Sequence, residues 1–274
     1  METVLLFRPE LDLEGEMEVA KKYFQVYTNR ATIPKDCTVI GRYSVLPYYN
    51  ELEKDLTCLG SKLVNTYREH SFIADITQWY PYLEGLTPKT WTSVYEIPFE
   101  EQGPFVIKGK TNSRKHSWNK RMYAETRGDI GRIMSSLYDD CLIAEQGTVI
   151  RKYEPFDIIL RGMNDLPITH EFRIFVYGQT IIDDGFYWSS HLDEIASKLG
   201  DVPSLEDYNY KNVYSTIMEA IGCLSKFSNS MFYTLDVAKM GEEWRVVEIN
   251  DGQMSGLSCI DPESFYSKLS NLVI

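Results

Sequence analysis

Residues 232–250 constrain the fold more than any other part of the chain, because apolar and polar residues alternate on both sides of a short polar stretch containing Gly241. Two alternating runs around such a stretch predict a β-hairpin. Side chains of a strand point alternately to the two faces of its sheet. One face of this hairpin is therefore expected to pack on a core, and it carries Tyr233, Leu235, Val237, Val247 and Ile249.

The other face of the hairpin carries Asp236, Glu248 and Asn250. If Asp236 pairs with Glu248, a three-residue turn at 241–243 joins the strands. Two carboxylates directly opposite each other destabilise a sheet. A divalent cation between them removes that penalty, and hard oxygen ligands suit Mg²⁺ carried by substrate phosphates. A polar face that simply meets solvent is the alternative interpretation.

The first part of the chain alternates between short apolar runs and helical stripes. Strands are expected at 3–8, 38–42 and 62–65, with amphipathic helices between them. Strand–helix alternation at this spacing predicts a small open α/β domain with a mostly parallel sheet. We expect this domain to span residues 1–95 and to precede a second domain at 96–274.

The second domain is expected to begin with a strand over 104–110, which places Val106 and Lys108 on one face and runs into a polar loop at 109–120. Between Gln102 and Ala124 the sequence has six Lys or Arg residues and no carboxylate. In a chain with a net charge of −12, this local excess favours an anionic partner such as phosphate. An exposed basic loop without a ligand is the simpler alternative.

Two further strands carry candidate site residues. One is expected at 148–153 and contains Arg151, and the other at 169–177 places Glu171 and Arg173 on the face opposite a run of apolar side chains.

Together, the lysine strand, the basic loop, the Glu171-Phe172-Arg173 strand and the acidic hairpin resemble the ATP-grasp superfamily, to which glutathione synthetase and D-alanine–D-alanine ligase belong. The most specific part is the sequence VVEIN, whose Glu248 lies twelve residues after Asp236. The chain looks like a divergent carboxylate–amine ligase-like branch. The resemblance implies an α+β ATP-grasp fold, in which two α+β subdomains grip the nucleotide, preceded by a small open α/β pre-ATP-grasp domain. Segment 96–149 would bear the lid and segment 150–274 the metal site.

The resemblance also implies roles for the matching residues, with ATP and Mg²⁺ as cofactors. Lys108 and Arg173 are expected to be catalytic, because they would neutralise charge on the transferred phosphoryl group. The backbone of Lys152 and Tyr153 would meet adenine. The expected nucleotide-binding set is Lys108, Arg151, Lys152, Tyr153, Glu171 and Arg173. The expected metal ligands are Asp236, Glu248 and Asn250.

Two departures from the family pattern leave assignments open. The phosphate loop of ATP-grasp proteins is commonly rich in glycine, whereas 109–120 contains only Gly109. Side chains could replace the backbone there, and the candidates are Lys110, Arg114, Lys115 and Lys120. The ribose-binding acid could be Glu154 or Asp157.

The expected function is a Mg-ATP-dependent carboxylate–amine or peptide ligase, which acts through an acyl phosphate and releases ADP and phosphate. A kinase on the same fold and a non-catalytic nucleotide-binding regulatory protein remain alternatives. The partners would be small-molecule or peptide acids and amines, whose identity the sequence does not give.

Composition narrows the remaining classes. A net charge of −12 argues against broad binding to nucleic acid or acidic membranes. The five cysteines are scattered without a CxxC pair, which suits reduced thiols. With no apolar stretch of membrane-spanning length, we expect a cytoplasmic protein of undetermined oligomeric state. The four histidines lack metal-ligand spacing, and His70 is expected to be a polar surface or capping residue.

Overall fold

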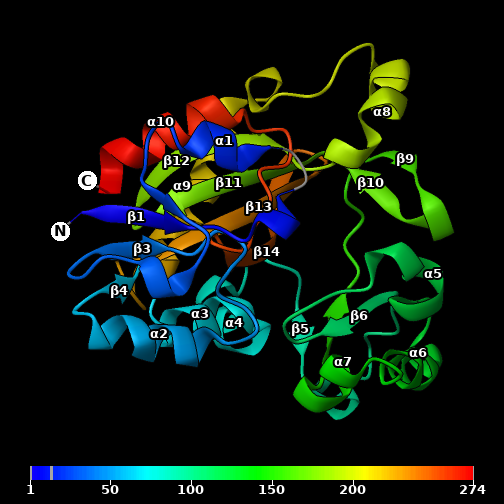
Figure 1. Cartoon of the computed structure of the whole chain (residues 1–274). Coiled ribbons are helices and arrows are strands. Elements are labelled where there is room, and N and C mark those ends of the chain that lie inside the picture. The colour runs from blue at the N-terminus through cyan, green and yellow to red at the C-terminus, as the bar shows by residue number, and fades with distance from the viewer. Residues whose placement is uncertain (1, 13–14, 274) are drawn as a thin grey trace.

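Three four-stranded sheets organise the part of the chain that the computed structural model describes, residues 2–12 and 15–273 (Figure 1). The first sheet is parallel, in the order β2-β1-β3-β4, as the strand–helix alternation predicted. Its strands are β1 (Thr3–Leu6), β2 (Val26–Tyr27), β3 (Thr38–Ile40) and β4 (Lys62–Leu63). The helices of this region are α1 (Glu16–Ala20), α2 (Tyr49–Cys58), α3 (Tyr67–Ala74) and α4 (Ile76–Leu83).

The start of α3 is fixed by a capping box. The Thr66 side chain accepts a hydrogen bond from the backbone of Glu69, and the Glu69 side chain accepts one from the backbone of Thr66. This reciprocal pair satisfies two backbone donors that would otherwise lack partners. It thereby fixes the place of the next residue, His70, at the edge of the central sheet.

The second sheet is antiparallel, in the order β5-β8-β6-β7, and forms a separate lobe on the right of Figure 1. We call this lobe the lid unit. Its strands are β5 (Thr90–Trp91), β6 (Phe105–Gly109), β7 (Tyr123–Ala124) and β8 (Thr148–Lys152), and its helices are α5 (Trp118–Arg121), α6 (Ile130–Leu137) and α7 (Cys141–Gln146). Because β5 precedes residue 96 and β8 crosses residue 149, the lid sheet draws on both sides of the expected limits. The division at 95 and 149 stays a prediction.

The third sheet is antiparallel, in the order β12-β11-β13-β14, and contains the hairpin. Its strands are β11 (Glu171–Tyr177), β12 (Thr180–Phe186), β13 (Phe232–Met240) and β14 (Glu243–Asp251). The remaining elements are α8 (Leu192–Leu199), α9 (Tyr210–Leu224), α10 (Pro262–Val273) and a hairpin of β9 (Ile158–Arg161) and β10 (Pro167–Thr169), which the sequence did not predict. No helix in 2–12 and 15–273 combines the length and the apolar character needed to cross a membrane.

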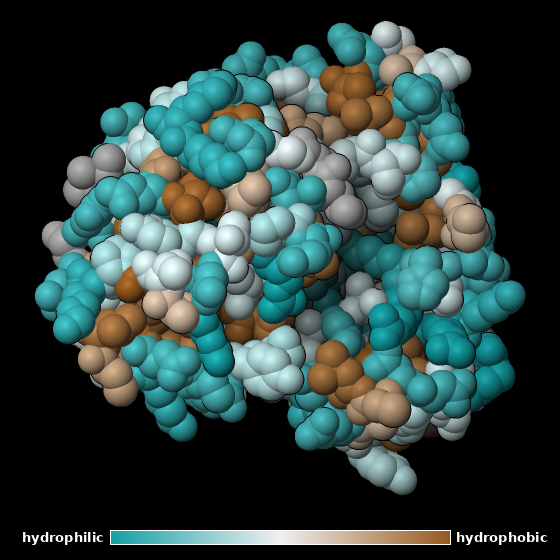
Figure 2. Space-filling view, in the orientation of Figure 1, coloured by the Kyte–Doolittle hydropathy of each residue, from teal (hydrophilic) through white to brown (hydrophobic). Residues whose placement is uncertain are grey.

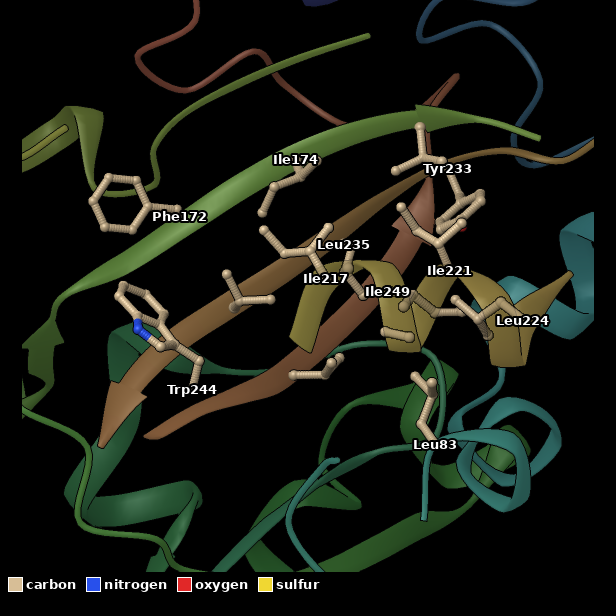
Figure 3. Close-up of a cluster of buried hydrophobic side chains, with 14 of the residues drawn as sticks. Leu83, Phe172, Ile174, Ile217, Ile221, Leu224, Tyr233, Leu235, Trp244 and Ile249 are labelled. Atoms are coloured by element: carbon tan, nitrogen blue, oxygen red, sulfur yellow. The ribbon is translucent and has the colours of Figure 1, made fainter. Parts of the chain in front are cut away.

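One face of the third sheet packs on α9, and Figure 3 shows the side chains that meet there. Ile217 and Ile221 of the helix and Leu235 of β13 are almost completely buried. Burying one such side chain stabilises the fold by about 1.5–3 kcal/mol. This core makes the sheet a rigid support and leaves its opposite face for polar side chains.

The hairpin contains a β-bulge next to the predicted carboxylate pair. Asp236 pairs with Glu248 as expected, but the next pair joins Val237 to Val246, so Val247 is an extra residue. The prediction that Val247 faces the core is therefore wrong: Val246 takes that place, and Val247 is only half-buried. The bulge also shortens the turn to 241–242, because Met240 pairs with Glu243.

Candidate active site

A row of four charged side chains crosses the third sheet on the face opposite α9. Arg173 of β11 is the register partner of Asp236 of β13, which in turn faces Glu248 of β14. Lys108 reaches over from β6 of the lid unit, and its Nζ lies 3.1 Å from Glu248 Oε1. The order cation, anion, anion, cation means that the protein's own cations offset the repulsion between the two carboxylates. The structure thus brings together four residues that the sequence singled out.

The pair formed by Arg173 and Asp236 is bidentate. Nε of Arg173 donates to Oδ1 at 2.9 Å, and Nη2 donates to Oδ2 at 2.8 Å. Such charge-assisted pairs fix geometry as well as charge. Both residues are buried, and Asn250 Nδ2 lies 3.5 Å from Asp236 Oδ2. The expected metal ligands therefore share one end of the row.

The pair formed by Lys108 and Glu248 joins the lid unit to the third sheet. Burial alone would raise the pKa of Glu248, but Lys108 and Lys115 outweigh it and lower this pKa to about 2. Burial lowers the pKa of Lys108, while Glu248 acts in the opposite direction. Glu248 is consequently a carboxylate at any physiological pH.

A cavity that we call the lid cavity lies between the lid sheet and the third sheet. Its lining includes Val106 and Lys108 from β6, the residues 151–154, and Glu171, Val247 and Glu248. Figure 2 shows the surface hollowed between the lid unit and the rest of the protein. The alternation in β6 explains this lining, because Phe105 and Ile107 are buried in the core of the lid unit.

The hinge residues 151–153 border the lid cavity, but their polar groups already have partners. The guanidinium of Arg151 donates to the carbonyl of Val247 at 2.7 Å, and burial lowers its pKa to about 10. The backbone N–H groups of Lys152 and Tyr153 donate to carbonyls of the lid unit and the strand before it. Arg151 therefore ties β8 to the bulge, and adenine contacts at Lys152 and Tyr153 stay a prediction.

Two carboxylate oxygens in the lid cavity are buried and have no hydrogen-bond partner within the described residues, Glu154 Oε2 and Glu171 Oε1. Asp157 instead binds Lys239 Nζ at 2.6 Å and the N–H of Gly241 at 2.9 Å. Of the two candidate ribose-binding acids, only Glu154 thus borders the cavity. Buried acceptors without a partner cost free energy, and a ligand hydroxyl or amine could remove this cost.

Among the four candidate cations of the basic loop, Lys115 has the central place. Its Nζ lies 2.9 Å from the Tyr187 hydroxyl and 4.0 Å from Glu171 Oε1. Arg114 instead pairs with Asp140. The sequence analysis did not single out Tyr187, whose ring also lies 4.8 Å from the Arg173 guanidinium.

The carboxyl of Glu171 should make stability depend on pH. Burial raises the pKa of Glu171 to about 7, against the opposing effect of Lys115. Since the folded protein holds this proton more tightly than the unfolded chain, the contribution is present below about pH 4.5 and is lost as pH rises through 7. Glu171→Gln should therefore stabilise the ligand-free protein above pH 7, by up to about 3 kcal/mol. Urea denaturation of both proteins at pH 5 to 8 measures this, and parallel curves would contradict it.

A second cavity, which we call the sheet-end cavity, has a volume of about 410 Å³ and adjoins the end of β14. Arg173, Glu248 and Asn250 line it, together with Lys115. Its volume lies in the range of small-molecule sites. Lys115 and Glu248 border both cavities, so the charged row separates and connects them.

His70 of α3 also lines the sheet-end cavity and is only 8% exposed, so the prediction of a surface or capping residue is wrong. Its Nδ1 lies 2.9 Å from Oδ2 of Asp251, the last residue of β14. The two residues are 181 positions apart. Local periodicity cannot report such a contact, and the only signal was an acid directly after Asn250.

Within the described ranges, no cluster of three or more His, Cys, Asp or Glu side chains is arranged to hold a metal ion. The expected set differs from such a cluster, because it combines two carboxylates with the amide of Asn250. All three side chains offer hard oxygen donors of the kind that Mg²⁺ prefers.

Two α+β units that close on a cavity lined by a strand lysine, a hinge strand and an Asp/Glu/Asn hairpin define an ATP-grasp protein. A family model described as an ATP-grasp domain, family 3 of its clade, matches residues 96–269, and the chain belongs to this ATP-grasp family. No curated protein matches the sequence.

Solved structures share the fold over nearly the whole chain. A RimK domain ATP-grasp protein from Sphaerobacter thermophilus is 12% identical at a TM-score of 0.63, with 100% of both chains covered. D-alanine–D-alanine ligase from Bacillus anthracis, complexed with ATP, is 14% identical at 0.58, covering 99% of this chain and 94% of that one. The ATP-grasp ligase PsnB, complexed with minimal precursor, Mg and ADP, is 11% identical at 0.57, with 99% and 96% covered. Identities this low establish the fold alone.

Proposed function

We propose that this protein is a Mg-ATP-dependent carboxylate–amine ligase, which converts an acid to an acyl phosphate, releases ADP, and then joins an amine with loss of phosphate. The carrying observation is the charged row between two adjoining cavities, because Lys115 and Glu248 border both. One cavity can hold the nucleotide while the other holds the acid and the amine. Membership of the ATP-grasp family supports this assignment.

In the lid cavity, each proposed contact follows from charge and position. Lys108 and Lys115 are buried cations at the boundary with the sheet-end cavity, where the terminal phosphates would lie. Glu154 offers its unpaired oxygen to a ribose hydroxyl. Preorganised cations lower the barrier to phosphoryl transfer because they face the charge that develops on the phosphate oxygens.

Asp236, Glu248 and Asn250 would hold Mg²⁺, since their oxygen donors fit a hard cation and two of them are register partners on one sheet face. When bound, Mg²⁺ supplies Lewis-acid polarisation of phosphate oxygens. Arg173 borders the sheet-end cavity while it holds Asp236, so its guanidinium can orient this carboxylate and bind the acid substrate.

The substrates are proposed to be a small-molecule or peptide acid and amine. The PsnB structures contain a precursor peptide, which supports testing peptides as well as small molecules. ADP release should be screened across pools of acids, each with and without pools of amines. An amide and free phosphate as products support the ligase. A stable phosphoester indicates the kinase, and nucleotide binding without turnover with any pool indicates a regulatory protein.

Nucleotide binding has its own test. Mg-ATP, or a non-hydrolysable analogue, should stabilise the protein by roughly 2.7 kcal/mol at a hundredfold excess over the Kd. Lys108→Met should abolish most of the resulting rise in Tm, measured against each variant's own ligand-free Tm. Lys62→Met is the matched control, because Lys62 also lies on a short strand but is exposed. The absence of any shift in the wild type would refute nucleotide binding.

A further inference from the structure

We propose that His70, oriented by Asp251, is the base that accepts a proton from the attacking amine. This inference rests on the proposed ligase function and adds a residue of the N-terminal region to its chemistry. None of the residues that resemble ATP-grasp motifs is involved, since His70 lies on α3 and Asp251 follows the Asn250 position.

The hydrogen bond between the two residues determines which imidazole nitrogen is free. A carboxylate oxygen accepts hydrogen bonds, so His70 Nδ1 donates to Asp251 Oδ2 at 2.9 Å. In neutral imidazole the other nitrogen, Nε2, then carries the lone pair. Within 2–12 and 15–273, Nε2 has no hydrogen-bond partner in the protein.

Both members of the pair are held in place. Asp251 Oδ1 accepts hydrogen bonds from Asn65 Nδ2 at 3.0 Å and from the backbone N–H of Gln253 at 2.9 Å. The imidazole stacks on the Tyr49 ring at a centroid distance of 4.3 Å. A ring fixed by one hydrogen bond and one stacking partner has a defined direction for its lone pair.

His70 stands where two spaces meet. It lines the sheet-end cavity and also an outer groove between α2, α3 and the start of the basic loop. The charged residues of this groove are Glu51, Asp75 and Lys110. Their excess of negative charge favours a cationic amine over an acid in the groove. An amine that enters there passes His70 before it reaches Arg173 and Asn250.

The proton balance requires a base at this point. An ammonium group cannot attack, so it first gives one proton to Nε2. Its nitrogen then forms the C–N bond while the acyl C–O bond breaks, and phosphate leaves with the bonding electron pair. The second proton of the amine leaves with phosphate as hydrogen phosphate, and imidazolium returns its proton to water. No oxidant or further reactant is needed.

The test compares two acceptors on the same acyl phosphate, with the acid and amine found by the ADP-release screen. Hydroxylamine is neutral near pH 7 and attacks without a base, whereas the amine substrate is protonated. His70→Asn keeps a donor in the position of Nδ1 and removes the base. Amide formation should fall by about 10²- to 10⁴-fold, while acid-dependent hydroxamate formation stays within about threefold of wild type.

Two further variants make the result decisive. His191→Gln is the control, because His191 lies outside both cavities and pairs with exposed Glu194. His70→Ala should regain part of its amide formation when free imidazole is added, which a purely structural role does not explain. Equal loss of both products, or no loss of either, overturns the role of His70. No hydroxamate from wild type with any acid overturns the ligase itself. Folding of each variant is checked by its Mg-ATP-induced rise in Tm, and His70→Gln replaces any variant that fails this check.

Discussion

Glu248→Gln should lower turnover with Mg-ATP by about 10²- to 10³-fold, since polarisation of the phosphates by the metal is worth several kcal/mol. The same change should destabilise the ligand-free protein by about 1–3 kcal/mol, because Lys108 loses the charge of its buried partner at 3.1 Å. The sequence alone predicts the opposite sign for stability, since two facing carboxylates repel. The charged row reverses it, because each carboxylate has its own cation.

Two measurements test this prediction, the Mg²⁺ dependence of nucleotide binding and urea denaturation without ligand. Glu243→Gln is the matched control, because Glu243 belongs to the same strand but its side chain is 67% exposed. It should leave both measurements near wild type. Identical Mg²⁺ curves for wild type and Glu248→Gln would mean that Glu248 does not bind the metal.

Arg173→Met should destabilise the protein by about 3–5 kcal/mol, which is the usual cost of breaking a buried ion pair from one side. The variant leaves Asp236, which is 1% exposed, without its bidentate partner. Turnover should be lost as well, because Arg173 borders the sheet-end cavity. Urea denaturation and ADP release measure the two effects.

A double variant separates the two roles of Arg173. Arg173→Met with Asp236→Asn should be more stable than Arg173→Met alone, since no buried carboxylate is left unpaired, and it should remain inactive. Arg161→Met is the control, because Arg161 forms an exposed pair with Asp165 that is worth at most about 1 kcal/mol. If Arg173→Met costs no more than this control, the bidentate pair does not support the site.

The period-2 alternation was sufficient to predict which residues share a sheet face. It placed Glu171 and Arg173 opposite the apolar side chains of β11, and it paired Asp236 with Glu248. These features follow from local geometry, because successive side chains of a strand point to opposite faces. The short parallel sheet followed equally from the spacing of strands and helices.

Contacts between distant segments could not be predicted in the same way. The ion pair of Lys108 with Glu248 and the hydrogen bond of His70 with Asp251 join elements that are far apart in the chain. Neither contact leaves a periodic trace in the sequence. The bulge at Val247 escaped prediction for a different reason, since a hairpin with one extra residue has the same letters as a regular hairpin with a longer turn.

That extra residue separates the hairpin into two parts that can change independently. The carbonyl of Val247 is held by Arg151, so the alignment of the acidic end is set halfway along β14 and not at the turn. Lengthening the chain at 241–242 would therefore leave Asp236 opposite Glu248. Removing Val247 would instead draw the outer half of the strand forward by one position and turn Trp244 and Val246 out of the core. Length variation among relatives is accordingly expected at the tip of the hairpin and not beside its carboxylates.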